Sequence, residues 1–234
     1  MKIEYPIRIN RYLALNNYAT RTGADNLIKK GYVTINGRKA VLGDKVQDGD
    51  KVVVSGKTPK DNYVYYAYNK ATGISTNPDL GSKDILQTTR FPVKVFPIGR
   101  LDKDSHGLIL MTNDGRITDR LLSPKYVHEK EYVVKVDPAF SDKFVELLGN
   151  GVHFDGFISQ KCKVWRKNKN TFHIILTEGK KRQIRRMCEA LHHTVVDLKR
   201  IRIMNIELEK IPLGAFEEIK GDKLKTLLES LNLV

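Results

Sequence analysis

The sequence has few cysteines and no long apolar run. Cys162 and Cys188 are the two cysteines among 234 residues, and they stand apart without the spacing of a metal site. Isolated thiols are typical of a protein kept reduced in the cytosol rather than of a disulfide scaffold. No apolar segment approaches the ~20 residues of a membrane-spanning helix, and the polar, basic N-terminus lacks the apolar centre of a signal peptide. The composition predicts a cytoplasmic protein with no membrane segment.

Acidic residues are outnumbered by basic ones. The chain carries 41 Lys and Arg residues against 27 Asp and Glu, which gives a formal net charge of +14 at pH 7. A surplus of this size attracts polyanions over long distances and favours a nucleic acid as the partner. The six histidines show no ligand spacing, so the sequence predicts no metal site.

The N-terminal part of the chain has the pattern of a small, self-contained unit. The pattern predicts a helix that begins near Ile9 and a second helix between a cap at Thr20 and a terminating Gly31. A strand, a hairpin turn at Asn36-Gly37 and a further strand follow. Basic side chains are spread over these elements and predict an RNA-binding surface. These residues are Arg8, Arg11, Arg21, Lys29, Lys30 and Arg38.

Composition divides the chain into residues 1–55, a polar and turn-rich linker at 56–62, and a larger domain at 63–234. Strand-like and helix-like runs alternate irregularly in the larger domain, so the expected class is α+β. The predicted strands are 63–68, 96–98, 108–111, 129–136, 159–165, 172–176 and 195–204. The predicted helices are 84–86, 117–122, 140–148 with a cap at Ser141, a charged helix from about 179, and 223–231.

A polar turn near the middle of the chain is the strongest candidate for chemistry. Asp102 lies in this turn after Arg100, between two short apolar runs. A carboxylate on a loop that two strands hold is well placed to act on a substrate. A surface turn of a basic protein gives the same pattern, and Asp104 and Asp114 are alternative acids.

Two parts of the sequence resemble known families. The pattern G-Y-V-T-I-N-G-R resembles the small RNA-binding domain of ribosomal protein S-four. In the larger domain, three motifs occur in order: G-R-L-D-K-D-S-H-G-L-I-L-M-T-N-D-G, K-E-Y and L-T-E-G-K-K-R-Q-I-R-R-M. Together they resemble the RsuA-type ribosomal RNA pseudouridine synthases, and most of all the RluF-type branch. The similarity spans nearly the whole chain.

The resemblance implies a fold, a reaction and a set of partners. The implied fold joins a small α/β RNA-binding domain to a catalytic domain with a mixed, mainly antiparallel sheet and flanking helices. The implied reaction is the isomerisation of uridine to pseudouridine in ribosomal RNA, most of all in the large subunit, by a monomer without a cofactor. A non-catalytic ribosome-assembly protein that binds ribosomal RNA is the alternative.

The resemblance also assigns roles to residues. Asp102 corresponds to the catalytic aspartate, Tyr132 to the tyrosine that stacks on the target base, and Arg185 to the basic residue that pairs with the aspartate. A neighbouring guanidinium would keep the carboxylate ionised, and an aromatic face would hold the detached uracil while it turns. The predicted RNA contacts of the larger domain are Lys70, Arg100, Lys180, Lys181, Arg182 and Arg186.

Overall fold

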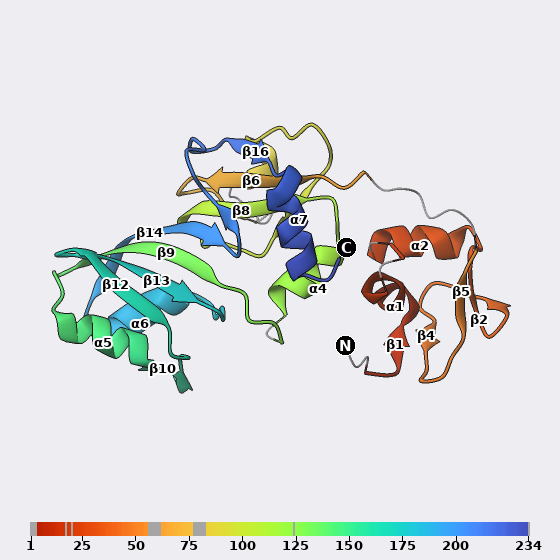
Figure 1. The fold of residues 1–234 in the computed structure, drawn as a ribbon, viewed down its shortest axis with the longest axis horizontal. Coiled ribbons are helices and arrows are strands. Elements are labelled where there is room, and N and C mark those ends of the chain that lie inside the picture. Colours follow the sequence, from red (N-terminus) through yellow and green to blue (C-terminus); the bar gives the residue numbers. More distant parts are fainter. Residues whose placement is uncertain are drawn as a thin grey trace.

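The computed structural model describes residues 4–16, 18–19, 21–55, 62–76, 83–123 and 125–233. The predicted linker 56–62 lies outside the described residues except for Asn62, and so does the predicted cap Thr20. Figure 1 shows a small N-terminal module and a larger module built on one long, twisted sheet.

Two helices and two small sheets form the N-terminal module. The elements are β1 (Ile7–Arg8), α1 (Ile9–Leu15), α2 (Arg21–Lys29), β2 (Val33–Ile35), β3 (Arg38–Lys39), β4 (Lys45–Val46) and β5 (Val52–Val54). Leu13, Ala24 and Val33 are fully buried in a common core between the helices and strands. Asn36 and Gly37 have φ angles of 51° and 82°, which confirms the predicted two-residue hairpin turn.

The larger module is organised around a nine-stranded sheet. Seven strands follow one another in the order β12-β13-β9-β14-β8-β6-β16, while β7 pairs with β8 and β15 with β14. Their bounds are β6 (Tyr65–Lys70), β7 (Phe96–Ile98), β8 (His106–Thr112), β9 (Lys130–Asp137), β12 (Lys163–Asn168), β13 (Thr171–Leu176), β14 (Thr194–Ile203), β15 (Ile206–Glu207) and β16 (Phe216–Glu218). A separate hairpin consists of β10 (His153–Phe154) and β11 (Phe157–Ile158).

The sheet has two halves that meet at one short parallel joint. Strand β14 pairs with β8 in parallel through Lys199 opposite His106 and Arg200 opposite Gly107. The other pairings described within this sheet are antiparallel. Gly107 has a φ of +105°, and a Cβ there would lie 2.8 Å from the amide nitrogen of Arg200 and closer still to its carbonyl oxygen. The joint therefore requires glycine at this position.

Helices cover the sheet, and three hydrophobic cores are buried in the larger module. Their bounds are α3 (Ile85–Thr88), α4 (Arg116–Leu122), α5 (Asp142–Asn150), α6 (Gln183–Ala190) and α7 (Gly221–Ser230). In Figure 1, α5 and α6 lie against the half formed by β9, β12, β13 and β14, whereas α4 and α7 lie beside β8. Phe144 and Phe172 belong to the first core, and Leu110 and Leu227 to the second. The predicted α+β class with a mixed, mainly antiparallel sheet is confirmed.

Two local predictions were wrong. The charged helix begins at Gln183, not near residue 179, because Arg182 takes a left-handed conformation with φ 52° at its N-cap. Lys180, Lys181 and Arg182 therefore lie in the loop before α6. The strand predicted at 159–165 runs from Lys163 to Asn168.

Candidate functional site

The loop that carries Asp102 is fixed by the segment that follows β6. The buried hydroxyl of Thr76 donates to the carbonyl oxygen of Leu101 at 2.7 Å and accepts from its amide at 3.1 Å. The amide of Gly73 donates to the carbonyl oxygen of Lys103 at 2.7 Å. Asp102 lies between these two anchored positions. Its half-buried side chain is therefore presented by a backbone held on both sides.

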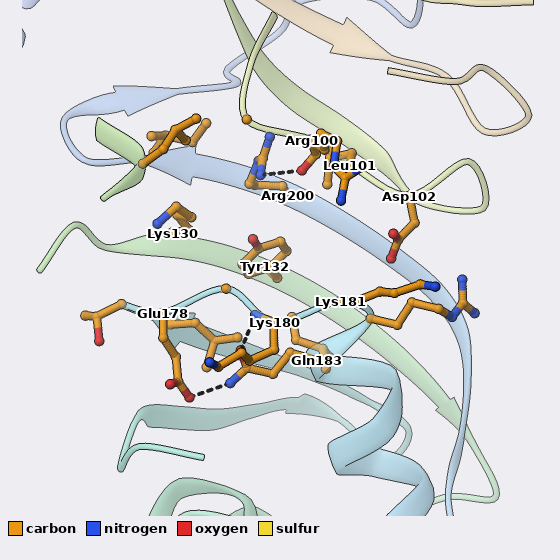
Figure 2. Close-up of a pocket in the computed structure, with 18 of the residues that line it drawn as sticks. Arg100, Leu101, Asp102, Lys130, Tyr132, Glu178, Lys180, Lys181, Gln183 and Arg200 are labelled. Carbon is orange, nitrogen blue, oxygen red and sulfur yellow. Dashed lines mark hydrogen bonds between the residues drawn. The ribbon is translucent and has the colours of Figure 1, made fainter. Parts of the chain in front are cut away.

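Asp102 lines a pocket of about 600 Å³ at the junction of the two sheet halves. Figure 2 shows Tyr132 on β9 near the centre of this pocket, with Asp102 to one side and Lys130 to the other. Arg200 on β14 forms part of the wall above Tyr132, and Lys180 lies below it.

Both alternative acids are engaged in ion pairs. Asp104 accepts two hydrogen bonds from Arg182, at 3.1 and 2.9 Å. Burial raises the pKa of Asp104, but the bond from Arg182 and the charge of Arg185 outweigh that effect and lower it. Asp114 is fully buried and accepts bonds from Arg116, at 2.9 and 2.8 Å. Both carboxylates serve the fold of the loops that carry them.

The Asp102 carboxylate has no such partner within the described residues. Cations nevertheless surround it. The pKa of Arg182 is raised by its hydrogen bond to Asp104 and, to a smaller extent, by the charge of Asp102. Burial lowers the pKa of Lys70 to about 8, against the opposing charges of Asp104 and Asp102. These cations lie near Asp102 without forming an ion pair with its oxygens.

Arg185 does not form the predicted ion pair with Asp102. Its guanidinium donates to the carbonyl oxygens of Val195, at 2.9 Å, and Asp104, at 3.0 Å. Its Nε also lies 3.3 Å from the Asp104 carboxylate. The side chain projects from α6 beneath the loop, so it joins the helix to β14 and to the residue two positions after Asp102.

Sequence reasoning overlooked Arg200 and Lys130. Arg200 is only 4% exposed, and its Nε donates to the carbonyl oxygen of Leu108 at 2.7 Å. Lys130 begins β9, two residues before Tyr132, and its Nζ donates to the carbonyl oxygen of His128 at 3.2 Å. The stretch from Leu198 to Ile203 reads L-K-R-I-R-I, and because three of its six residues are basic, the sequence contains no local signal that Arg200 is the buried one.

The predicted RNA contacts fall into three groups. Arg8, Arg11, Arg21, Lys29, Lys30, Arg100, Lys180 and Lys181 are exposed on the surface. Arg38, Arg182 and Arg186 pair with Asp44, Asp104 and Asp155. Lys70 is a correction, because it is fully buried and its Nζ donates to the carbonyl oxygens of Ala71, at 2.9 Å, and Ile74, at 2.7 Å. It stabilises the segment that anchors the Asp102 loop and cannot touch RNA from there.

The described part of the chain lacks two kinds of feature. No three His, Cys, Asp or Glu side chains gather there as they would around a metal ion. In the same residues, no helix has the length and apolarity needed to cross a membrane.

Two known families and several known proteins match this chain. The model of a family described as RNA pseudouridylate synthase matches residues 64–190, and that of the S4 domain matches residues 7–52. A dual-specificity RNA pseudouridine synthase RluF from Salmonella typhi is 41% identical over 227 residues, which cover 95% of this chain and 78% of the relative. The chain belongs to the RNA pseudouridylate synthase family.

Other members of the RNA pseudouridylate synthase family match over a similar length. Ribosomal large subunit pseudouridine synthase B from Bacillus subtilis is 34% identical over 231 residues, which cover 94% of this chain and 95% of the relative. A crystal structure of a pseudouridylate synthase superposes with a TM-score of 0.70 at 27% identity, covering 96% of this chain and 99% of that one. The protein is thus an RNA pseudouridine synthase with an N-terminal S4 domain, as predicted.

Proposed function

We propose that the protein converts uridine to pseudouridine in large-subunit ribosomal RNA, with Asp102 as the catalytic carboxylate. The observation that carries this proposal is the unpaired state of Asp102 among the described residues, in a pocket that also holds Tyr132. The neighbouring acids Asp104 and Asp114 are each paired with an arginine. A binding protein has no use for an unpaired acid that faces an anionic ligand.

The chemistry suits these side chains. Isomerisation breaks the bond from C1′ of the ribose to N1 of uracil, turns the ring, and joins C1′ to C5. A carboxylate can attack the sugar or the ring, and an aromatic ring holds the turning base by its face without fixing its in-plane orientation. The target uridine must leave its stack to reach the pocket. We assign the first role to Asp102 and the second to Tyr132.

Arg185 acts on the reaction indirectly in this proposal. Its bonds to the backbone at Asp104 and Val195 tie α6 and β14 to the loop of the catalytic acid. It is therefore a positioning residue, and the positive charges that interact with Asp102 are those of Lys70 and Arg182.

The RNA is held mainly by charge and shape. We propose that residues 1–55 act as one RNA-binding domain, that 56–62 connect it to the catalytic domain 63–234, and that the protein works as a cytoplasmic monomer. One relative supports a large-subunit target through its own description, as a ribosomal large subunit pseudouridine synthase. The exposed cations of the N-terminal module give it the positive surface that backbone phosphates require.

The target is tested on transcripts. Bacterial large-subunit and small-subunit ribosomal RNA are incubated with the protein, and pseudouridine is mapped by carbodiimide modification and primer extension. We expect a specific stop in the large-subunit RNA and none with Asp102→Asn. Pseudouridine confined to small-subunit RNA, or formed equally by the variant, would contradict the proposal.

A further inference from the structure

Two cations share one wall of the pocket, and neither has an acidic partner within the described residues. Arg200 uses its Nε on the carbonyl oxygen of Leu108, at 2.7 Å, and its Nη1 reaches that of Arg100 at 3.4 Å. Its buried Nη2 has no hydrogen-bond partner. Lys130 has one bond, to the carbonyl oxygen of His128. The pair therefore keeps donors available on the wall of the pocket.

Two neighbouring cations in a partly buried site destabilise the protein unless an anion binds to them. Burial lowers the pKa of Lys130, and the charge of Arg200 lowers it further. Two like charges in a partly dry site repel each other, and an unsatisfied buried donor adds to the cost. Functional sites are where such arrangements are found, because a ligand supplies the missing partner.

The pair lies beside the predicted position of the target base. Arg200 is the cross-strand partner of Tyr132, and Lys130 precedes Tyr132 by two residues on the same strand, so both share its side of the sheet. Asp102 lies on the other side of Tyr132 (Figure 2). A ring stacked on Tyr132 therefore has Asp102 near one edge and the cation pair near another.

We propose that Arg200 and Lys130 bind the oxygens of uracil and stabilise the negative charge that the ring acquires during isomerisation. This inference rests on the proposed function. When the bond from C1′ to N1 breaks, its electron pair stays with uracil and spreads over N1, O2 and O4, while C1′ is left electron-poor. If Asp102 attacks the ring instead, the displaced pair again reaches a uracil oxygen. In both cases C5 later bonds to C1′ and loses its proton, and N1 gains one.

The location favours the ring over a backbone phosphate as the ligand. Arg200 is 4% exposed and lies beside Tyr132 on the neighbouring strand. The lysines of the loop before α6, Lys180 and Lys181, are exposed at the pocket and are therefore better placed for phosphates. Donors aimed at the place where charge develops lower the barrier most in a site that excludes water.

The test compares two RNA substrates that differ at one atom. Single-turnover rate constants are measured for the wild type, Lys130→Met and Lys130→Arg. The substrate is the ribosomal RNA fragment on which the protein acts, with uridine or 5-fluorouridine at the target position. Loss of the starting nucleoside is followed after nuclease digestion, because C5 of 5-fluorouridine carries no proton to lose and its C5-linked product takes up water at C6 instead. RNA affinity is measured by filter binding. Fluorine withdraws electrons and stabilises a uracil anion without help from the protein.

We expect Lys130→Met to react about 100-fold more slowly on uridine, with a clearly smaller loss on 5-fluorouridine, unchanged RNA affinity and partial rescue in Lys130→Arg. Equal losses on both substrates, or weaker binding with an unchanged rate constant, would overturn the inference and point to a structural role or a phosphate contact. Arg200→Gln, which removes the charge, gives the same comparison if Lys130→Met does not fold. A wild type that isomerises neither substrate would instead contradict the proposed function itself.

Discussion

Replacing Gly107 by alanine tests the joint on which the pocket is built. The backbone at Gly107 has a φ of +105°, and the added Cβ would overlap the backbone of Arg200 on the neighbouring strand. Strained backbone costs about 1–3 kcal/mol, and overpacking at a site that cannot relax costs about 1–3 kcal/mol more. The neighbour is backbone in a paired strand, not the end of a flexible side chain, so the cost cannot be relieved cheaply.

We expect Gly107→Ala to lower the free energy of unfolding by roughly 3 kcal/mol, from the sum of these two effects. For a protein of this size each kcal/mol lowers Tm by about 2–4 °C, so the expected fall is about 6–12 °C. Differential scanning calorimetry measures it, with the transition of the larger module followed separately. Turnover should fall as well, since β14 carries Arg200 and the loop before β8 carries Asp102.

Gly214→Ala is the matched control. Gly214 also has a positive φ, +76°, but a Cβ there would meet no atom within 4 Å. Gly214→Ala should lower the free energy of unfolding only by the backbone strain, about 1 kcal/mol, and should leave turnover unchanged. If the two variants had the same Tm and the same activity, the close approach of β8 and β14 would not matter and the reasoning would be refuted.

Three other substitutions test separate parts of the account. Thr76→Val removes the hydroxyl that holds the Asp102 loop. It should lower kcat about tenfold, a loss of ~1.4 kcal/mol in transition-state stabilisation, with unchanged RNA affinity. The control variant Thr88→Val should leave kcat unchanged. Lys70→Met removes a buried ammonium whose pKa is lowered to about 8. Above that pH the unfolded wild type binds more protons than the folded protein, so its free energy of unfolding should rise relative to that of the variant. The expected rise is up to about 1 kcal/mol per pH unit between pH 8 and 10, measured by denaturant titration. Replacing Lys29 and Lys30 by alanine should weaken RNA binding and flatten its dependence on salt.

These three predictions have clear contrary outcomes. Equal kcat for the two threonine variants would mean that the loop does not need its anchor. A difference between wild type and Lys70→Met that stays constant across pH would mean that the lysine is as basic as in solution. For the RNA contact, Lys167 and Lys169 are exposed lysines far along the chain from the N-terminal module. Replacing Lys167 and Lys169 by alanine should leave the salt dependence of RNA binding unchanged. If this pair and the Lys29/Lys30 pair had equal effects, RNA binding would depend on the net charge of the protein and not on a surface of the N-terminal module.

Local features of the fold could be predicted because short-range geometry determines them. Asn36-Gly37 favours a left-handed pair of φ angles wherever two strands flank it, and the structure has that turn. The helix expected at 140–148 begins after Ser141, its predicted cap. The short helix expected near residue 84 has a capping box between Asp84 and Gln87.

Features that depend on contacts distant in the chain could not be predicted in this way. Arg185 was expected to pair with Asp102, but the carboxylate near it in space is that of Asp104. The start of α6 moved because Arg182 adopts a left-handed conformation while binding Asp104, 78 residues away. The burial of Arg200 depends on a parallel pairing between strands about a hundred residues apart, and no local pattern specifies that partner.

The most direct test of the account is the release of tritium from carbon 5 of uracil. Large-subunit ribosomal RNA fragments labelled at that position are incubated with the wild type, Asp102→Asn and Asp104→Asn. The account predicts release by the wild type, reduced but measurable release by Asp104→Asn, and none by Asp102→Asn with RNA affinity retained. Release by Asp102→Asn at the wild-type rate would contradict the assignment of the catalytic acid.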